Sequence, residues 1–364
     1  MRIQEQLIGR GLPAFPGREE AVRLLCEREY GILPPFDWRT EVSAPTDVES
    51  RLCAGQASLS RVTLTVTTRA GRHAFPVWRL LHHDGRQHPF FVLLNFHPGA
   101  PGLYFPAEEI ADAGFGVLSF CYRDVASDDG NFEDGLCGLL PMGDRSAPHA
   151  PGKLAVWAWA ASRVLDLAPE LPCLDPARAA VLGHSRLGKA ALLAGMLDER
   201  FAFVISNDSG CGGAALARGS LGAVGAVGAY GKTGESIRRI TETFPYWFAP
   251  AYRRWAESNA PDGFDQHFLL GAIAPRHVYV ASADMDDWAD PDSEFLCCLA
   301  ADAAWRAHGL PGLAHTGGLP QPGECLHGGC IGYHRRHGMH FLSRYDWNRF
   351  MEYIGRHTPQ DAGK

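Results

Sequence analysis

The stretch AAVLGHSRLGKAALLAG, residues 179–195, decides the fold class. A short apolar run ends just before Ser185, and a segment with helical spacing of apolar residues follows at once. A buried strand that turns sharply into a helix, with serine at the turn, is typical of a nucleophile elbow. The usual elbow has glycine two residues before and two residues after the serine. Here Gly183 fits, but Leu187 takes the second place and the glycine follows at Gly188. The stretch therefore predicts either a catalytic serine on a variant elbow or a structural corner.

Strands and helices alternate on both sides of this corner. Residues 60–69 and 73–83 alternate β-branched and polar residues, which predicts an antiparallel pair. Buried strands are expected in HPFFVLLNF, GVLSFCY, ARAAVLGHS, FAFVISN and HVYVASA, and helices in AVRLLCEREY, KLAVWAWAASRVLDL, RLGKAALLAGMLDER and DWNRFMEYIGRH. This alternation predicts an α/β protein with a mostly parallel central sheet and helices on both faces.

The chain of 364 residues is predicted to form a single domain. Residues 1–50, rich in proline and in charges of both signs, are expected to pack on it as an N-terminal extension. Residues 219–234, GSLGAVGAVGAYGKTG, are predicted to be an inserted, mobile loop rich in glycine and alanine. This glycine pattern lacks the strand–turn–helix context of a phosphate-binding loop.

Composition excludes several functions. A formal charge of −7 without a run of Lys and Arg disfavours nucleic acid as a partner. No apolar stretch of about 20 residues is present, so no membrane partner is expected. The start of the sequence shows no leader pattern, which predicts a cytoplasmic protein, or a secreted one if a leader has been removed. No cofactor is expected, and the oligomeric state is left open.

A serine hydroxyl becomes a useful nucleophile when a histidine takes its proton and an acid orients that histidine. His340 lies just before the closing helix, after the last predicted strand, where such a histidine is expected. Asp286 follows the strand HVYVASA and Asp208 follows the preceding strand, so either can supply the acid. His334 and His337, in the same predicted loop as His340, are interpreted as solvated or supporting residues. Ser343 and Asp346 are expected to cap the closing helix.

These residues resemble the glucuronoyl esterases of carbohydrate esterase family fifteen, especially the bacterial branch. The family signature is a serine followed by arginine, any residue, glycine and lysine, and it stands here in GHSRLGKAAL. Further similar stretches are NDSGCGGAALAR, GESIRRITETFPYWF, FDQHFLLGAIAPRHVYVASADMDDWADPDSEF and IGYHRRHGMHFLSRYDW. The resemblance covers most of residues 90–355. It implies a three-layer α/β-hydrolase sandwich and a serine esterase that cleaves esters of glucuronic acid through an acyl-enzyme.

The resemblance also implies roles for individual residues. Ser185 matches the nucleophile and His340 the general base. Arg186 matches an arginine of the oxyanion hole. The resemblance implies contacts with the sugar for the side chains of Lys189, Glu235 and Trp288.

The chain departs from the family pattern at two places. Asp208 stands where members usually have glutamate, so Asp286 is preferred as the triad acid and Asp208 as a second acid or an orienter of the histidine. The insertion before Glu235 has no recognised counterpart.

Three other interpretations remain open. The first is a broader carbohydrate esterase, such as an acetyl xylan esterase, which would share the triad. The second is a binding protein that keeps the fold without catalysis. The third is a metal site in CLHGGCIGYH, where Cys325, His327, Cys330 and His334 are potential ligands, although their spacing matches no common zinc pattern. No metal is predicted.

Overall fold

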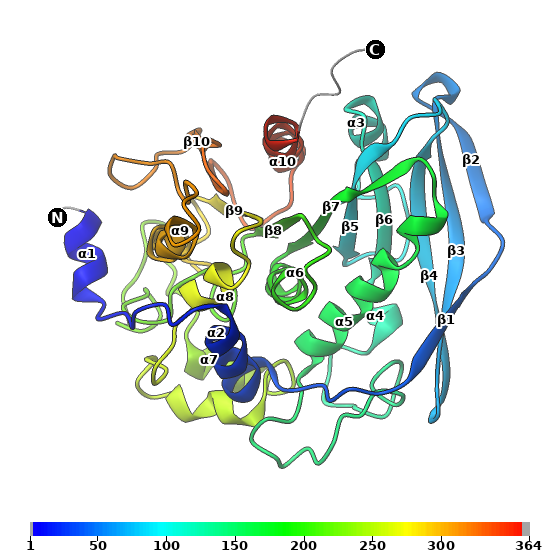
Figure 1. Cartoon of the computed structure of the whole chain (residues 1–364). Helices are drawn as coiled ribbons and strands as arrows, with labels where there is room; N and C mark the ends of the chain where they lie inside the picture. Colours follow the sequence, from blue (N-terminus) through cyan, green and yellow to red (C-terminus); the bar gives the residue numbers. More distant parts are fainter. Residues whose placement is uncertain (1–2, 359–364) are drawn as a thin grey trace.

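A computed structural model describes residues 3–358, which form an 11-stranded mixed sheet covered by helices (Figure 1). The strand order is β1-β3-β4-β6-β5-β7-β8-β9-β11-β10, and β2 pairs with β3. The strands are β1 (Trp38–Val42), β2 (Thr46–Leu52), β3 (Ala57–Thr68), β4 (Gly71–His82), β5 (His88–Asn95), β6 (Gly116–Cys121), β7 (Leu174–His184), β8 (Phe203–Asn207), β9 (His277–Ala283), β10 (Cys325–Leu326) and β11 (Ile331–Arg336).

The helices follow the alternation that the sequence predicts. They are α1 (Ile3–Gly9), α2 (Arg18–Leu25), α3 (Ala107–Asp112), α4 (Tyr122–Val125), α5 (Lys153–Leu165), α6 (Arg186–Leu197), α7 (Ile237–Thr243), α8 (His267–Gly271), α9 (Pro291–Arg306) and α10 (Arg344–His357). A π-helical turn, η1 (Cys26–Tyr30), and the 3-10 turns η2 (Cys53–Gly55), η3 (Ala168–Glu170) and η4 (Pro250–Trp255) complete the elements. Within the described residues, no helix has the length and apolar character needed to cross a membrane.

The sheet has a parallel centre and antiparallel edges. Strands β6, β5, β7, β8, β9 and β11 are parallel neighbours, whereas β1, β2, β3, β4 and β10 pair antiparallel. The predicted antiparallel pair is confirmed as β3 and β4, joined between Thr68 and Gly71. The predicted fold class, a three-layer α/β-hydrolase sandwich, is confirmed.

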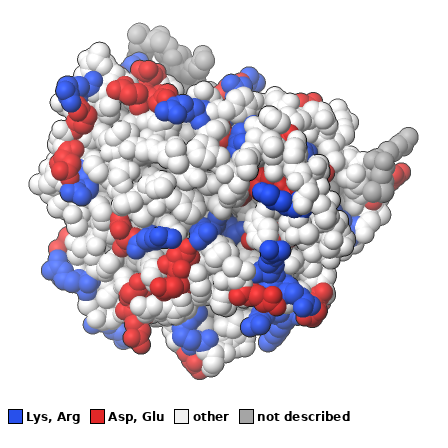
Figure 2. Space-filling view, turned by 180° about the vertical axis from the view of Figure 1, so that it is seen from behind, with Lys and Arg blue, Asp and Glu red and all other residues white. Residues whose placement is uncertain are grey.

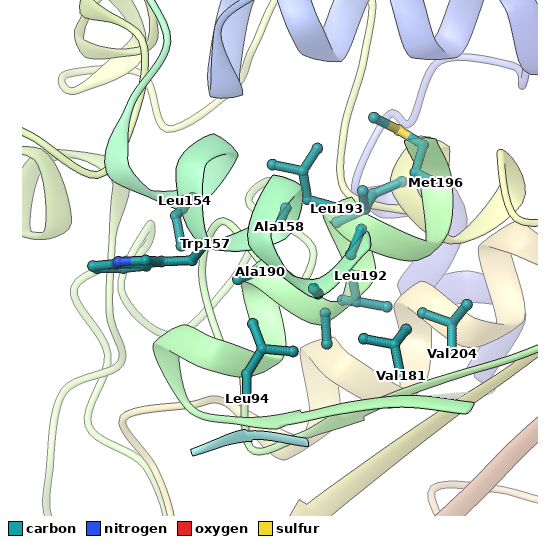
Figure 3. Packing of buried hydrophobic residues seen from close by; sticks show 14 of the residues in the cluster. Leu94, Leu154, Trp157, Ala158, Val181, Ala190, Leu192, Leu193, Met196 and Val204 are labelled. Carbon is teal, nitrogen blue, oxygen red and sulfur yellow. The ribbon is translucent and has the colours of Figure 1, made fainter. Parts of the chain in front are cut away.

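Alternate residues of the central strands belong to opposite layers. In β5, Phe90, Val92 and Leu94 join the core under α5, α6 and α9, while Phe91 and Leu93 join the core under α3 and α10. Figure 1 shows these two groups of helices on opposite sides of the sheet. Figure 3 shows the first core, where Leu94, Val181 and Val204 of the sheet lie beneath side chains of α5 and α6. Burial on both faces explains why these strands read as continuous apolar runs.

One expectation near the C-terminus is wrong. The sequence predicts a loop with three histidines in the stretch GYHRRHGMH, but residues 331–336 form β11, parallel to β9. The side chains of Ile331, Tyr333 and His334 are all buried. The polar residues of this strand made it look like a loop in the sequence. They are buried because distant segments supply their hydrogen-bond partners, as Tyr279 and Asp346 do for His334. His337 and His340 do lie in the loop that follows, and Ser343 and Asp346 form the predicted capping box of α10.

The surface carries charges of both signs. On the face seen in Figure 2, Lys and Arg side chains lie among Asp and Glu, with uncharged areas between them. The N-terminal residues contribute both to the covering layer, through α1 and α2, and to the sheet, through β1.

Candidate active site

Ser185 occupies a strained turn between β7 and α6. Its backbone has φ 57° and ψ −129°, a combination that few non-glycine residues adopt. Two glycines make the turn possible. A Cβ on Gly183 would lie 2.0 Å from the carbonyl oxygen of Leu187, and one on Gly188 would lie 3.0 Å from both Ser206 and Ser209. The glycine that comes one residue late in the sequence therefore lies where α6 passes close to the end of β8.

Three side chains from distant segments form a hydrogen-bonded chain. The Oγ of Ser185 lies 2.8 Å from Nε2 of His340, and Nδ1 of His340 lies 2.6 Å from Oδ2 of Asp286. Asp286 is buried, whereas the side chain of His340 is 38% exposed at the pocket. Asp286 lies on the loop after β9 and His340 on the loop after β11. Both loops leave the carboxyl edge of the sheet, where Ser185 also lies.

Asp208 does not bond to His340. Its carboxylate accepts hydrogen bonds from the backbone N–H of Ala283 at 2.8 Å and from the guanidinium of Arg336 at 3.1 Å. The backbone N–H of Phe341, next to His340, lies 3.4 Å from Oδ2 of Asp208. Asp208 thus contacts the histidine loop, while Asp286 contacts the imidazole itself.

Arg336 fixes the loop that carries His340. Its guanidinium donates to the carbonyl oxygens of Met339, at 2.9 Å, and Phe341, the two neighbours of His340. The same group donates to both carboxylate oxygens of Asp346 at 2.9 and 3.0 Å. A buried guanidinium with this many acceptors is held in one orientation. The histidine backbone is therefore clamped on both sides.

A second histidine packs against the first. The ring centroids of His184 and His340 are 4.5 Å apart, and Nδ1 of His184 lies 2.6 Å from the side-chain oxygen of Asn207. Burial, with a smaller contribution from His340, lowers the pKa of His184 to about 3. His184 is therefore neutral near pH 7 and adds no competing positive charge beside His340.

Arg186 is held by an acidic and aromatic cage. Its guanidinium forms an ion pair with Asp128, a residue on the loop after α4. The same carboxylate accepts from the indole N–H of Trp247 at 2.8 Å and from the hydroxyl of Tyr122 at 2.9 Å. The guanidinium carbon also lies 4.7 Å from the ring centroid of Trp247 and 5.2 Å from that of Phe244. These contacts keep the cation beside Ser185.

Lys189 and Glu235 form a buried ion pair at the floor of the pocket. The ammonium of Lys189 lies 3.1 Å from Oε2 of Glu235 and also donates to the carbonyl oxygens of Ser209 and Cys211, at 2.5 and 2.7 Å. Burial raises the pKa of Glu235, and the ammonium of Lys189 opposes that shift. The three protons of the ammonium are occupied by these acceptors. Lys189 therefore holds Glu235 and the loop after β8 in place.

A cavity of about 420 Å³ unites the predicted residues. All eight residues singled out from the sequence line it: Ser185, Arg186, Lys189, Asp208, Glu235, Asp286, Trp288 and His340. Lys232, Arg239, Phe244 and Trp247, which the sequence did not point to, line it as well. The indole of Trp288 is half-buried on its wall, and the guanidinium of Arg239 lies 4.7 Å from its ring centroid.

The insertion reaches this cavity. Oδ2 of Asp287 accepts hydrogen bonds from the backbone N–H groups of Tyr230, at 2.9 Å, and Lys232, at 3.1 Å. The hydroxyl of Tyr230 donates to Asp284 at 2.9 Å. Residues 219–234 are therefore tied to the segment that carries Asp286 and Trp288.

The alternative metal site is not assembled among residues 3–358. His327 and His334 both lie within hydrogen-bond distance of the hydroxyl of Tyr279, and His334 also bonds to Asp346. The group of potential ligands found in this part of the chain is Asp208, Asp286 and His340. Asp286 and His340 belong to the hydrogen-bonded chain that ends at Ser185, and Asp208 accepts from Ala283 and Arg336.

Sequence reasoning missed Asp128, Arg336, Lys232 and Arg239. Asp128 lies in an acidic loop, SDDG, without a motif, and Arg336 lies in a strand that was read as a loop. Their roles depend on partners that are far away in the sequence. Asp128 and its partner Arg186, for example, are 58 positions apart. The signature around Ser185 could have suggested a counter-ion for Arg186, but not which one.

Comparison with known proteins assigns the family. Residues 103–309 match the family described as glucuronyl esterase of fungi. The carbohydrate esterase MZ0003, from an unknown prokaryotic organism, is 37% identical over 95% of this chain and 85% of its own length. The 4-O-methyl-glucuronoyl methylesterase of Podospora anserina is 28% identical over 80% of this chain and 56% of its own length.

Solved structures agree with this assignment. A promiscuous family-fifteen carbohydrate esterase from a marine bacterial metagenome superimposes with a TM-score of 0.80 at 30% identity, covering 94% of this chain and 91% of its own. The glucuronoyl esterase from Solibacter usitatus superimposes with a TM-score of 0.82 at 28% identity, covering 94% of this chain and 97% of its own. The fold and the serine–histidine–aspartate arrangement are those of an α/β-hydrolase acting on carboxylic esters. The chain belongs to the glucuronyl esterase family.

The predicted cytoplasmic location is contradicted by this assignment. The homologous glucuronoyl esterases are secreted, extracellular enzymes. The prediction rested on the missing leader pattern, and a mature secreted chain lacks its leader too, so that observation does not discriminate between compartments.

Proposed function

We propose that this chain hydrolyses esters of glucuronic acid through an acyl-enzyme formed on Ser185. The observation that carries the proposal is the hydrogen-bonded chain from Ser185 through His340 to Asp286, which opens into the same cavity as Arg186 and the Lys189–Glu235 pair. Relatives named 4-O-methyl-glucuronoyl methylesterases support the choice of acyl group.

In the first half-reaction, Nε2 of His340 accepts the proton of Ser185 while Oγ attacks the ester carbonyl. Asp286, bonded to Nδ1, keeps the imidazole in the tautomer that leaves Nε2 free to accept. The carbonyl oxygen becomes an anion in the tetrahedral intermediate. The first backbone N–H of α6, that of Arg186, has no acceptor within its helix. This N–H and the guanidinium of Arg186 supply the donors that stabilise the anion.

The collapse of the intermediate transfers the proton from His340 to the leaving alcohol. Water then attacks the acyl-enzyme while His340 accepts its proton, and His340 returns that proton to Oγ of Ser185 as the free uronate leaves. Trp288 offers an aromatic face to the C–H surface of the sugar, and Glu235 offers a carboxylate to its hydroxyl groups. Lys189 acts as a positioning residue for Glu235.

The experiment measures the hydrolysis of methyl and benzyl glucuronate, with acetylated xylose as the competing substrate class. We expect activity on both uronates and little on the acetate. Ser185→Ala should abolish turnover. Asp286→Asn should lower kcat by on the order of 10⁴, because asparagine stabilises the wrong tautomer. Asp208→Asn should cost less than about tenfold, since Asp208 acts through Arg336 and the loop.

Full activity in Ser185→Ala would rule out the proposed mechanism. A larger loss in Asp208→Asn than in Asp286→Asn would reassign the triad acid. Circular dichroism of each variant separates a chemical loss from misfolding.

A further inference from the structure

We propose that the rim of the active-site cavity holds a second binding site, formed by Lys232 and Arg239, for an oxyanion on the glycan that carries the ester. The preferred substrate is then an esterified glucuronate on an acidic glycan, rather than an isolated uronate ester. This proposal rests on the proposed function, because it concerns the same cavity.

The charges that line the cavity do not balance. Arg186 is paired with Asp128, and Lys189 is paired with Glu235. Asp208 is paired with Arg336, and Asp286 is hydrogen-bonded to the imidazole of His340. In the described chain, neither Lys232 nor Arg239 has a carboxylate within 4.0 Å, although both line the cavity. The side chains of Lys232 and Arg239 are therefore the lining cations that lack a carboxylate partner in the described part of the chain, and an anionic ligand can pair with them.

Lys232 and Arg239 are held in place by one short segment. The backbone N–H of Lys232 donates to Asp287, and its carbonyl accepts from Gly228 at 2.8 Å. The guanidinium of Arg239 stacks on Trp288 and lies 3.5 Å from the hydroxyl of Thr233. The segment that supplies Asp287 and Trp288 directly follows Asp286. The backbone of Lys232 and the guanidinium of Arg239 are thus both held next to the segment that carries Asp286.

Lys232 and Arg239 lie on the side of the cavity where the sugar ring of the substrate is expected to bind. The backbone N–H of Glu235 donates to the carbonyl oxygen of Trp288 at 3.0 Å, so Lys232 and Arg239 adjoin the two residues assigned to the sugar ring. An oxyanion on a neighbouring sugar can therefore reach them while the ester lies at Ser185. A carboxylate or a sulfate has the required charge and acceptor oxygens, and a guanidinium can bind either with two parallel hydrogen bonds.

The test compares three substrates that share the methyl glucuronate ester. One is a neutral glycan, one has a second, free uronate carboxylate on the neighbouring sugar, and one has a sulfate there. The selectivity ratio is kcat/KM for a charged substrate divided by kcat/KM for the neutral one. We expect a wild-type ratio of about ten or more, and a roughly fivefold fall in each of Lys232→Gln and Arg239→Gln, as for an exposed ion pair. The larger ratio identifies carboxylate or sulfate as the bound group.

Arg238→Gln is the matched control. Arg238 is adjacent and exposed, but its guanidinium pairs with Glu257 and does not line the cavity. Its variant should keep the wild-type ratio. High salt should also reduce the wild-type ratio, since the screening length falls from about 10 Å at 0.1 M to about 3 Å at 1 M.

Two results overturn the proposal. One is a wild-type ratio near one for both charged substrates. The other is an equal fall in the ratio for Arg238→Gln and for the two rim variants. Failure of the wild type to hydrolyse any of the three substrates would refute the proposed function instead. Hydrolysis of the neutral ester without a charge preference refutes the anion site alone.

Discussion

The guanidinium of Arg186 depends on one carboxylate for its orientation. Asp128 is 5% exposed and receives three donors, from Arg186, Trp247 and Tyr122. A cation that stabilises a transition state contributes most when it needs no reorganisation during the reaction. Asp128 is therefore a positioning residue for the proposed oxyanion hole, although it contacts no reacting atom.

Asp128→Asn tests this role at the residue scale. The amide keeps the shape but loses the charge, so Arg186 should become less well fixed. We expect kcat on methyl glucuronate to fall about tenfold with a smaller change in KM, because the loss concerns the transition state. Asp129→Asn is the control, since its carboxylate binds only Ser127 and Asn131 on an exposed turn. A change in KM alone would contradict the assignment.

At the scale of elements, the insertion behaves as a docked loop. Its backbone N–H groups at Tyr230 and Lys232 converge on Asp287, and Gly228 lies against the same carboxylate. A Cβ on Gly228 would lie 2.2 Å from Oδ1 of Asp287, so glycine at this position permits the close approach. Gly228 thus allows the insertion to contact Asp287 closely.

Gly228→Ala should loosen the insertion. The added methyl group must displace the Asp287 carboxylate, which breaks the hydrogen bonds that it accepts from the backbone N–H groups of Tyr230 and Lys232. We expect faster hydrogen exchange across residues 226–234, with exchange in the central strands unchanged. Gly318→Ala is the control, because a Cβ there meets nothing within 4 Å. Unchanged exchange in Gly228→Ala would mean that the carboxylate does not hold the loop.

At the scale of the whole molecule, buried acids join segments that are far apart. Glu29, in η1, is fully buried and accepts from the side-chain amide of Gln266 at 2.7 and 2.9 Å, across 237 positions. Burial raises the pKa of Glu29 from its ordinary 4.5 to about 8, and the hydrogen bonds from Gln266 oppose the shift. Burial also raises the pKa of Glu294 to about 8.

These shifts predict how stability varies with pH. Between the two pKa values Glu29 holds its proton in the folded state and has lost it in the unfolded state, so its contribution to the free energy of unfolding falls as pH rises from 4.5 to about 8. Each group contributes at most about 1.4 kcal/mol per pH unit. Glu29→Gln stays neutral throughout, so it should remove the contribution of Glu29 and make the fall in stability with pH less steep than in the wild type. Urea unfolding at several pH values measures it.

Glu27→Gln is the control for this experiment. Glu27 is two residues away, but its side chain is 39% exposed and pairs with Arg23 on the surface. Its replacement should leave the slope unaltered. A slope in Glu29→Gln equal to that of the wild type would show that Glu29 is already ionised in the folded protein.

Local patterns predicted the parallel sheet, the elbow at Ser185 and the positions of His340 and Asp286, because each depends on residues adjacent in the chain. Burial on both faces produces apolar runs, and a tight turn demands glycine. Local patterns did not predict strand β11. A buried His334 needs hydrogen-bond partners, and these come from Asp346 and Tyr279, which are distant in the sequence. The sequence alone likewise left Asp286 and Asp208 as alternative acids, and the distances separate them.

By itself, the sequence determined the fold class, the family resemblance and the chemical types in the cavity, because apolar periodicity and short motifs are local properties. Only the tertiary structure decided which charges are neutralised by a partner. It showed that Asp128 pairs with Arg186 and that Arg336 clamps the histidine loop, while Lys232 and Arg239 have no carboxylate partner among the residues that the structure describes. The physical reason is that an ion pair depends on distances of a few ångströms in space, and those distances arise only when separated segments fold together.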